Sequence, residues 1–220
     1  MQVERSGTAV YRLGERAVVL GVSPPASLRV QRRIWRLARV ARTWSGVCSA
    51  VPGMNNLTVL LADDGADPAW ERRLFDAWND ARDDDAPEGR LVDIPVTYGG
   101  DCGPDLEFVA ERCGMLPREV AALHAQGEYV VYFLGFQPGF AYLGGLDSRL
   151  HIARRDRPRG FVPAGSVGIA GEQTGVYPAR APGGWHLIGR TGAVLFDAAR
   201  EPAALLSPGD RVRFVANAVS

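Results

Sequence analysis

Two kinds of hydrophobic spacing alternate along the first 81 residues. Strand-like runs, separated by turn residues such as Gly14 and Pro52-Gly53, lie at residues 9–13, 17–22, 47–51 and 57–62. Helical spacing takes over twice, with apolar side chains three or four positions apart from Val30 to Trp44 and again from Trp70 to Ala81. The pattern predicts a compact α+β unit in which two helices cover one face of an antiparallel sheet.

Both predicted helices carry signals for their first residues. Ser23 is placed to cap the first helix, with Pro24 and Pro25 in the first turn, where a missing backbone donor is tolerated. Asp67-Pro68 opens the second helix. The first helix also carries a stripe of five arginines opposite its apolar face. Because the net charge of the chain is zero, a solvated helix face explains this stripe better than a nucleic-acid contact.

A charged, proline-containing stretch at residues 81–90 predicts a linker between two domains, 1–88 and 89–220. The second domain starts with a strand at residues 92–97. It continues with two short helices, which are expected to start at Pro104 and Pro117, the first of them ending at Gly114.

The rest of the second domain is expected to be strands and turns. The continuously apolar run 128–134 predicts a strand, and no sustained helical spacing follows residue 145. This pattern is typical of a β-barrel that carries two short helices.

Glycine and proline are concentrated in one stretch, where they make up 13 of the 35 residues from Pro158 to Gly192. A helix does not tolerate that density, so the stretch predicts short strands joined by tight turns, with backbone N–H groups facing a ligand. Two interpretations stay open at this point: a barrel corner built from small and rigid residues, and a binding site.

Composition excludes several classes of function. With 25 basic and 25 acidic residues, nothing indicates binding to nucleic acid or to an anionic membrane. Every basic residue is arginine, so the chain cannot carry covalent biotin, form a Schiff base with pyridoxal phosphate, or supply the lysine of a phosphate-binding loop. No apolar run is long enough to span a membrane, and the N-terminal residues lack the apolar stretch of a secretion signal, so none is expected.

Cysteines and histidines give no sign of a metal centre. The three cysteines, Cys48, Cys102 and Cys113, are odd in number and lack CxxC spacing, which favours reduced thiols in a cytoplasmic protein over a disulfide framework or a zinc site. No two of the three histidines, His124, His151 and His186, have the spacing of metal ligands, and no carboxylate cluster accompanies them. No metal held by the protein is therefore expected.

Candidate catalytic residues are few. Ser166 lies in Ala-Gly-Ser-Val-Gly, which superficially resembles a nucleophile elbow but lacks the helix that should follow it. His124 is expected near the C-terminus of a helix, where a cation interacts favourably with the helix dipole. His186 follows the Gly183-Gly184-Trp185 turn and is the histidine expected near a ligand, either as a base or in a structural role.

A site built from backbone and neutral polar groups is the more credible one. Such groups can cradle a small amide or carboxylate and stabilise an oxyanion. Phe136, Phe140 and Tyr142 could add an aromatic wall, although barrel core is the simpler explanation for each of them. Arg190 could hold a carboxylate or staple the barrel through a salt bridge. The candidate substrate-binding residues are Phe136, Gly139, Gly165, Ser166, Gly171, Gln173, Thr174, Tyr177, His186 and Arg190.

Five segments of the chain resemble the family of 5-oxoprolinase B subunits, which is also labelled allophanate hydrolase subunit 1. They read IPVTYGGDCGPDL, YFLGFQPGFAYLGGLD, VPAGSVGIAGEQTGVYP, PGGWHLIGRT and SPGDRVRF, and the resemblance runs from about Tyr11 to Phe214. Two positions depart from the family pattern: Cys102 stands where an aromatic is commoner, and Ala153 where proline is usual. The resemblance implies an α+β N-terminal domain followed by a mainly β, cyclophilin-like barrel domain.

The resemblance also implies a function. It points to one component of an ATP-dependent 5-oxoprolinase complex, a lactam hydrolase that converts 5-oxo-L-proline to L-glutamate together with a homologous C subunit (allophanate hydrolase subunit 2-like) and an A subunit. ATP would be used by the complex, and the chain alone is expected to bind no cofactor and to be inactive. Two alternatives remain: subunit 1 of an allophanate hydrolase in urea degradation, and a non-enzymatic inhibitor that binds a sensor histidine kinase.

Overall fold

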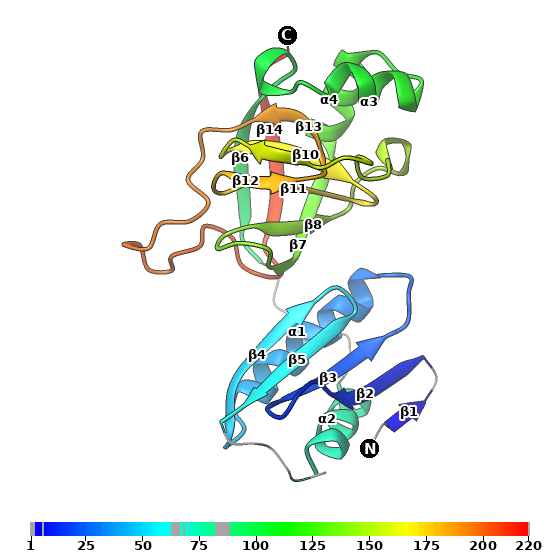
Figure 1. The fold of residues 1–220 in the computed structure, drawn as a ribbon, viewed down its shortest axis with the longest axis vertical. Coiled ribbons are helices and arrows are strands. Elements are labelled where there is room, and N and C mark those ends of the chain that lie inside the picture. The colour runs from blue at the N-terminus through cyan, green and yellow to red at the C-terminus, as the bar shows by residue number, and fades with distance from the viewer. Residues whose placement is uncertain (1–2, 6, 63–66, 68, 82–88, 220) are drawn as a thin grey trace. The chain divides into compact units, whose positions relative to one another are not determined.

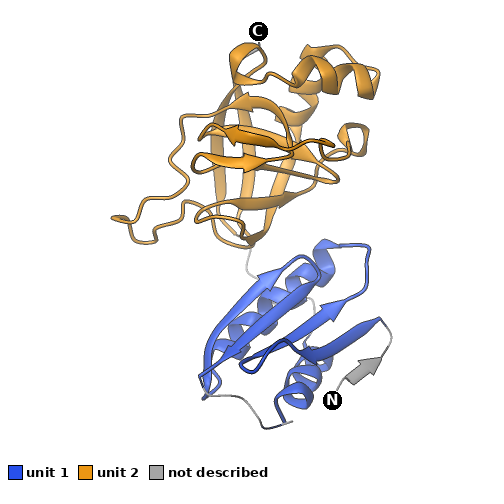
Figure 2. Cartoon of the chain, viewed as in Figure 1, with its two compact units in different colours: residues 1–88 blue, residues 89–220 orange. Residues whose placement is uncertain are grey.

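The chain folds into two compact units, residues 1–88 and 89–220, each with its own hydrophobic core (Figure 2). The structure is a computed structural model that describes residues 3–5, 7–62, 67, 69–81 and 89–219. Most of the predicted linker at 81–90 lies outside these described residues. Among the helices that are described, none combines the length and the apolar character needed to cross a membrane.

The first unit is a five-stranded antiparallel sheet in the order β1-β2-β3-β5-β4 with two helices (Figure 1). Its elements are β1 (Val3–Arg5), β2 (Thr8–Arg12), β3 (Ala17–Val22), α1 (Leu28–Arg42), β4 (Val47–Gly53), β5 (Asn56–Leu61) and α2 (Ala69–Asp80). Helix α1 packs on β4 and β5, α2 packs on β2 and β3, and the two helices contact each other. They share one core with the sheet, which is the arrangement that the spacing predicts.

Helix α1 begins later than predicted. Its N-cap is Ser27, whose hydroxyl accepts a hydrogen bond from the backbone N–H of Val30 at 3.2 Å. A proline disfavours helical backbone in the residue before it, so Pro24-Pro25 keeps the preceding residues out of the helix. The expectation that Ser23 caps this helix is therefore wrong.

Seven strands of the second unit close into a barrel in the order β10-β11-β8-β7-β14-β6-β13 (Figure 1). They are β6 (Leu91–Tyr98), β7 (Glu128–Leu134), β8 (Ala141–Gly144), β10 (Ser166–Ala170), β11 (Gln173–Val176), β13 (His186–Arg190) and β14 (Arg211–Val219). All pairs are antiparallel except β6 with β14, so the first and last strands of the unit run side by side in parallel. Asp210 fastens this junction by accepting hydrogen bonds from the N–H groups of Arg90 at 3.1 Å and Ser207 at 2.9 Å.

Short elements surround the barrel. They are the 3-10 turns η1 (Gly100–Cys102) and η2 (Ser148–Leu150), the helices α3 (Leu106–Cys113) and α4 (Pro117–Gln126), and the two-stranded pair β9 (Arg159–Val162) and β12 (Ala181–Gly183). Helix α3 starts two residues after Pro104 and ends at Gly114, which has a left-handed φ of 66°. The predicted fold class, an α+β domain followed by a mainly β barrel, is confirmed.

Candidate functional site

The ten predicted site residues do not converge on one pocket. Six of them are buried in the second unit: Gly139, Gly165, Ser166, Thr174, Tyr177 and His186. Phe136 and Gly171 are exposed, and Gln173 and Arg190 are half-buried. Among the described residues Arg190 has no ion pair; its guanidinium makes one long hydrogen bond, 3.4 Å, to the carbonyl of Asp101. Of the ten, His186 alone lines the pocket described below.

Backbone N–H groups of the glycine-rich stretch are used inside the protein. Gly165 donates to the carbonyl of Tyr177 at 2.7 Å, and Gly171 donates to the carbonyl of Ile152 at 2.6 Å. The N–H of Ser166 reaches the carbonyl of Pro163 at 3.3 Å. These three donors were expected to face a ligand, and the structure instead uses them in turns and at strand ends.

The predicted aromatic wall is largely a second hydrophobic core. Phe140 packs edge-on against Tyr177 and Trp185, with ring centroids 5.3 and 5.5 Å apart, and all three side chains are buried. Tyr142 packs against the same cluster. Phe136, which has a φ of 66°, is 57% exposed and touches the cluster only at its edge, so one aromatic of the predicted wall faces outward.

A chain of buried polar groups crosses the barrel interior. The Tyr98 hydroxyl on β6 lies 2.7 Å from His124 Nδ1 on α4, and His124 Nε2 lies 2.8 Å from the Thr174 hydroxyl on β11. The hydroxyl of Thr174 donates onward to the carbonyl of Gly168 at 3.1 Å. Since that hydroxyl has given its proton to Gly168, it accepts from His124 Nε2–H, and Nδ1 accepts from Tyr98. These hydrogen bonds therefore fix one neutral tautomer of His124.

Burial sets the protonation of this histidine. The His124 side chain has no exposed surface, and loss of solvation lowers its pKa to about 3. The ring also stacks on Phe214, with centroids 4.6 Å apart. The expectation of a cation that interacts with the helix dipole is therefore wrong, because the imidazole is neutral and points into the barrel. His124 also contacts Thr174, one of the predicted site residues, through this hydrogen bond.

The second unit has a pocket of about 670 Å³ between helix α3, the segment 151–157 and the start of β13. The side chains of Phe108 and Arg112 line it from α3, and His186 lines it from β13. Its volume is in the range of pockets that bind small molecules. Segment 151–157 brings an unusual concentration of arginine, which the carboxylate of Asp105 partly orders.

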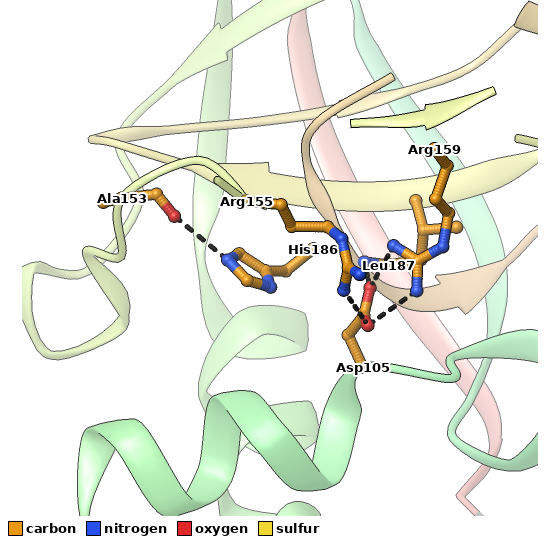
Figure 3. A network of polar contacts seen from close by, with 6 residues as sticks. All are labelled: Asp105, Ala153, Arg155, Arg159, His186 and Leu187. Carbon is orange, nitrogen blue, oxygen red and sulfur yellow. Dashed lines mark hydrogen bonds and ion pairs between the residues drawn. The ribbon is translucent and has the colours of Figure 1, made fainter. Parts of the chain in front are cut away.

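Asp105, the residue before α3, is the anchor of the pocket (Figure 3). Arg159 donates hydrogen bonds to its carboxylate from two guanidinium nitrogens, at 2.7 and 2.8 Å, and Arg155 donates a third at 2.9 Å. The backbone N–H of Leu187 on β13 supplies a fourth hydrogen bond at 2.7 Å. This Asp105 clamp ties α3, the arginine segment and β13 together, and it uses all four acceptor positions of the carboxylate.

Electrostatics keep the anchor ionised. Burial by itself raises the pKa of Asp105, but the hydrogen bonds from Arg159 and Leu187 and the charges of Arg159 and Arg155 outweigh it, so the pKa lies below its usual value. Asp105 is thus a carboxylate that holds two guanidiniums in place and not a proton donor or acceptor at neutral pH.

His186 forms one wall of the pocket. Its Nε2 lies 3.0 Å from the carbonyl of Ala153, so Nε2 carries the proton (Figure 3). The ring stacks on Phe108 at a centroid distance of 5.2 Å. Its Nδ1 is buried and has no hydrogen-bond partner among the described residues. Burial is the main reason that the pKa of His186 lies below its usual value, so the ring is neutral at neutral pH.

Sequence reasoning missed the Asp105 clamp and the arginine segment. The residues of the clamp are 50 and 54 positions apart, and no periodicity connects them. One local feature could have suggested the site: the run ARRDRPRG, residues 153–160, places four arginines within six positions of a stretch otherwise rich in glycine and proline. The only sequence feature that hinted at a partner for these arginines was the carboxylate of Asp105, near the N-terminus of a short helix.

Comparison with known proteins places this architecture in a family. Residues 8–206 match the family described as carboxyltransferase domain, subdomain C and D. The 5-oxoprolinase B subunit of Escherichia coli O157:H7 is 52% identical over 205 residues, which cover 93% of this chain and 94% of that protein. This chain belongs to the family of 5-oxoprolinase B subunits. The predicted family is therefore confirmed.

Two solved structures show the same fold. TTHA0988 is 38% identical with a TM-score of 0.77, and the match covers 91% of this chain but only 40% of that protein. The urea amidolyase of K. lactis has a TM-score of 0.80 at 20% identity, over 96% of this chain and 15% of that protein. At this low identity the likeness to urea amidolyase speaks for the fold alone. This family fold therefore also occurs as one part of longer chains.

Proposed function

We propose that this chain is the B subunit of an ATP-dependent 5-oxoprolinase, which hydrolyses the lactam of 5-oxo-L-proline to give L-glutamate. The observation that carries the proposal is the 52% identity to a 5-oxoprolinase B subunit along nearly the full length of both chains. The closed barrel, with its Asp105 clamp and its pocket, also supports the proposal that this chain is a functional subunit. The proposal places the protein in the cytoplasm, in keeping with its three unpaired cysteines.

The chain acts as one part of a complex and not as an autonomous enzyme. Lactam opening that is coupled to ATP needs groups that hold and transfer a phosphoryl group, for which proteins commonly use lysine and Mg²⁺. The sequence has no lysine. In the described residues, no three His, Cys, Asp or Glu side chains are placed to hold a metal ion together. The A and C subunits, the second of them homologous to this chain, are expected to supply the ATP chemistry.

Part of the substrate pocket is expected to come from this chain. Four of the predicted residues keep a buried polar atom without a hydrogen-bond partner among the described residues: Ser166 Oγ, Gln173 Nε2, His186 Nδ1 and Arg190 Nε. Buried polar atoms are normally satisfied, so such atoms favour positions that gain a partner from water, substrate or another protein of the complex. Ser166 and Arg190 also pair directly across β10 and β13, so they lie on one face of the barrel wall.

Reconstitution of the complex tests the proposal. The chain is co-expressed with the A and C subunits, and release of ADP and of glutamate is measured with and without 5-oxo-L-proline. Turnover is expected only when all three proteins are present, and ADP release should depend on 5-oxo-L-proline. A complete three-protein preparation that releases no glutamate would reject the function. Turnover by this chain alone would show instead that the complex is not required.

A further inference from the structure

The arginine pocket carries more positive charge than the protein itself neutralises. Arg112, Arg154, Arg155 and Arg157 line it, and Asp156 is the acidic residue among its lining side chains. Within the part of the chain that the structure describes, neither Arg154 nor Arg157 forms an ion pair or a hydrogen bond, and Arg112 only covers the ring of Phe108 at 5.3 Å. The formal charge of the lining side chains is therefore strongly positive when His186 is neutral.

Asp105 cannot cancel this charge. All four of its acceptor positions are already filled by Arg155, Arg159 and the N–H of Leu187. It carries one negative charge against two guanidiniums, so the clamp itself remains positive. What the clamp does provide is order, because it holds Arg155 while the backbone N–H of Arg155 donates to the carbonyl of Gly184 at 2.8 Å. Arg155 lies between Arg154 and Arg157 in the chain, so its two contacts fix the segment that presents them.

Two buried nitrogens in this pocket lack partners. Arg155 Nε and His186 Nδ1 are both covered and have no hydrogen bond within the described residues. His186 is 4% exposed, and Phe108 fixes its ring from one side. Arg155 Nε can only donate, and His186 Nδ1 donates once the ring is protonated. An anion would neutralise the charges of the arginines and would stabilise a protonated His186, whereas a neutral apolar ligand would do neither.

We propose that this pocket is a binding site for a small oxyanion, the carboxylate or phosphate group of a small molecule, held by the guanidiniums of Arg112, Arg154 and Arg157. Guanidinium groups suit both anions because their planar forks donate two parallel hydrogen bonds. The bound anion should also favour the protonated form of His186, which lies in the wall of the same pocket.

Calorimetric titration of the full-length chain tests this site directly. Inorganic phosphate and 5-oxo-L-proline are titrated separately at constant ionic strength, with sodium chloride making up the difference, so that only specific binding is measured. We expect saturable binding of at least one of them in the millimolar range or tighter. Binding of phosphate alone would identify a phosphoryl subsite, and binding of 5-oxo-L-proline would identify a carboxylate subsite.

Variants then locate the binding. The double change Arg154→Ala and Arg157→Ala should weaken binding by at least about tenfold, since it removes two charge-assisted contacts. The matched control, Arg32→Ala with Arg72→Ala, removes the same charge from exposed positions of α1 and α2 and should leave binding unchanged. Melting temperatures confirm that each variant folds.

A second readout uses NMR and does not depend on the heat of binding. The side-chain ¹⁵N resonances of His186 should move toward the protonated form as anion is added, and should stay in place in the Arg154/Arg157 variant. The proposal is overturned if neither anion binds, if binding survives the double change, or if the control pair weakens it equally. None of these results depends on partner proteins or on turnover, so they are independent of the proposed 5-oxoprolinase activity.

Discussion

His124 should make the second unit lose stability as the pH falls below neutrality. The pKa of the buried ring is about 3, whereas a histidine in an unfolded chain titrates near 6.5. Between these two values the unfolded state takes up a proton that the folded state does not, so acid favours unfolding. The stabilisation is complete above the unfolded pKa and is lost progressively as the pH falls toward the folded one.

The size of the effect follows from the two pKa values. Inside that window each pH unit changes the free energy of unfolding by about 1.4 kcal/mol. Lowering the pH from about 7.5 to about 5 should therefore remove about 2 kcal/mol through His124 alone. The lowered pKa of Asp105 matters at lower pH, since its stabilisation is lost only below the ordinary carboxylate value of 3.8. Burial also lowers the pKa of His186, which adds to the loss of stability in acid. The contribution of His124 therefore has to be isolated by comparing the parent protein with a variant.

The variant His124→Gln isolates the contribution. A glutamine amide can accept from Tyr98 and donate to Thr174 but does not titrate. Urea unfolding is measured at both pH values through the indole NMR signal of Trp185, the one tryptophan in residues 89–220. Any packing energy that the substitution removes is the same at both pH values. The stability lost between the two pH values is therefore compared for the parent and the variant, and the difference reports the titration of His124 alone. The parent protein should lose about 2 kcal/mol more than His124→Gln.

One outcome would contradict this assignment. If His124→Gln loses as much stability as the parent between the two pH values, then the ring of His124 is already protonated or solvated in the folded protein. The hydrogen-bonded chain through Tyr98 and Thr174 would then be wrong.

Three further substitutions test the packing of the second unit. Asp105→Asn leaves two guanidiniums without a counter-charge and should lower the free energy of unfolding by about 3 kcal/mol in urea titrations; a loss below about 1 kcal/mol would contradict the clamp. Gly165→Ala would drive a methyl group into the carbonyl of Thr191, whereas Gly171→Ala meets nothing within 4 Å, although both residues have a positive φ. We expect about 1 kcal/mol for Gly171→Ala and at least about 3 kcal/mol for Gly165→Ala, and equal melting temperatures for the two variants would refute this.

Hydrophobic spacing predicted the elements well because each element buries one face. The strand expected at 128–134 is β7 without a shift, and the apolar face from Ile34 to Ala41 packs on the sheet of the first unit. The error at Ser23 is local: a capping hydroxyl is recognised by residue type, but here two residues, Ser23 and Ser27, could serve. The choice depends on how Pro24-Pro25 directs the backbone, which spacing does not report.

The polar sites could not be predicted in the same way. Tyr98, His124 and Thr174 come from three elements and meet only because the barrel closes. Each looks unremarkable alone, and the charge of His124 depends on a degree of burial that its own helix does not reveal. Asp105 and Arg159 likewise pair across 54 residues. For such groups the chemistry follows from the tertiary structure.

The density of glycine was a correct observation that admitted two explanations, and the structure favours the one based on packing. A Cβ on Gly189 would approach Val96 Cγ1 to 2.7 Å and the carbonyl of Thr97 to 2.9 Å, and a Cβ on Gly175 would approach the carbonyl of Ala141 to 2.8 Å. These glycines let neighbouring strands of a small barrel lie close together. The charged pocket, by contrast, is lined by a segment with no glycine from His151 to Arg157. At Gly175 and Gly189 glycine therefore marks where the backbone is crowded, whereas the arginines gather at the pocket.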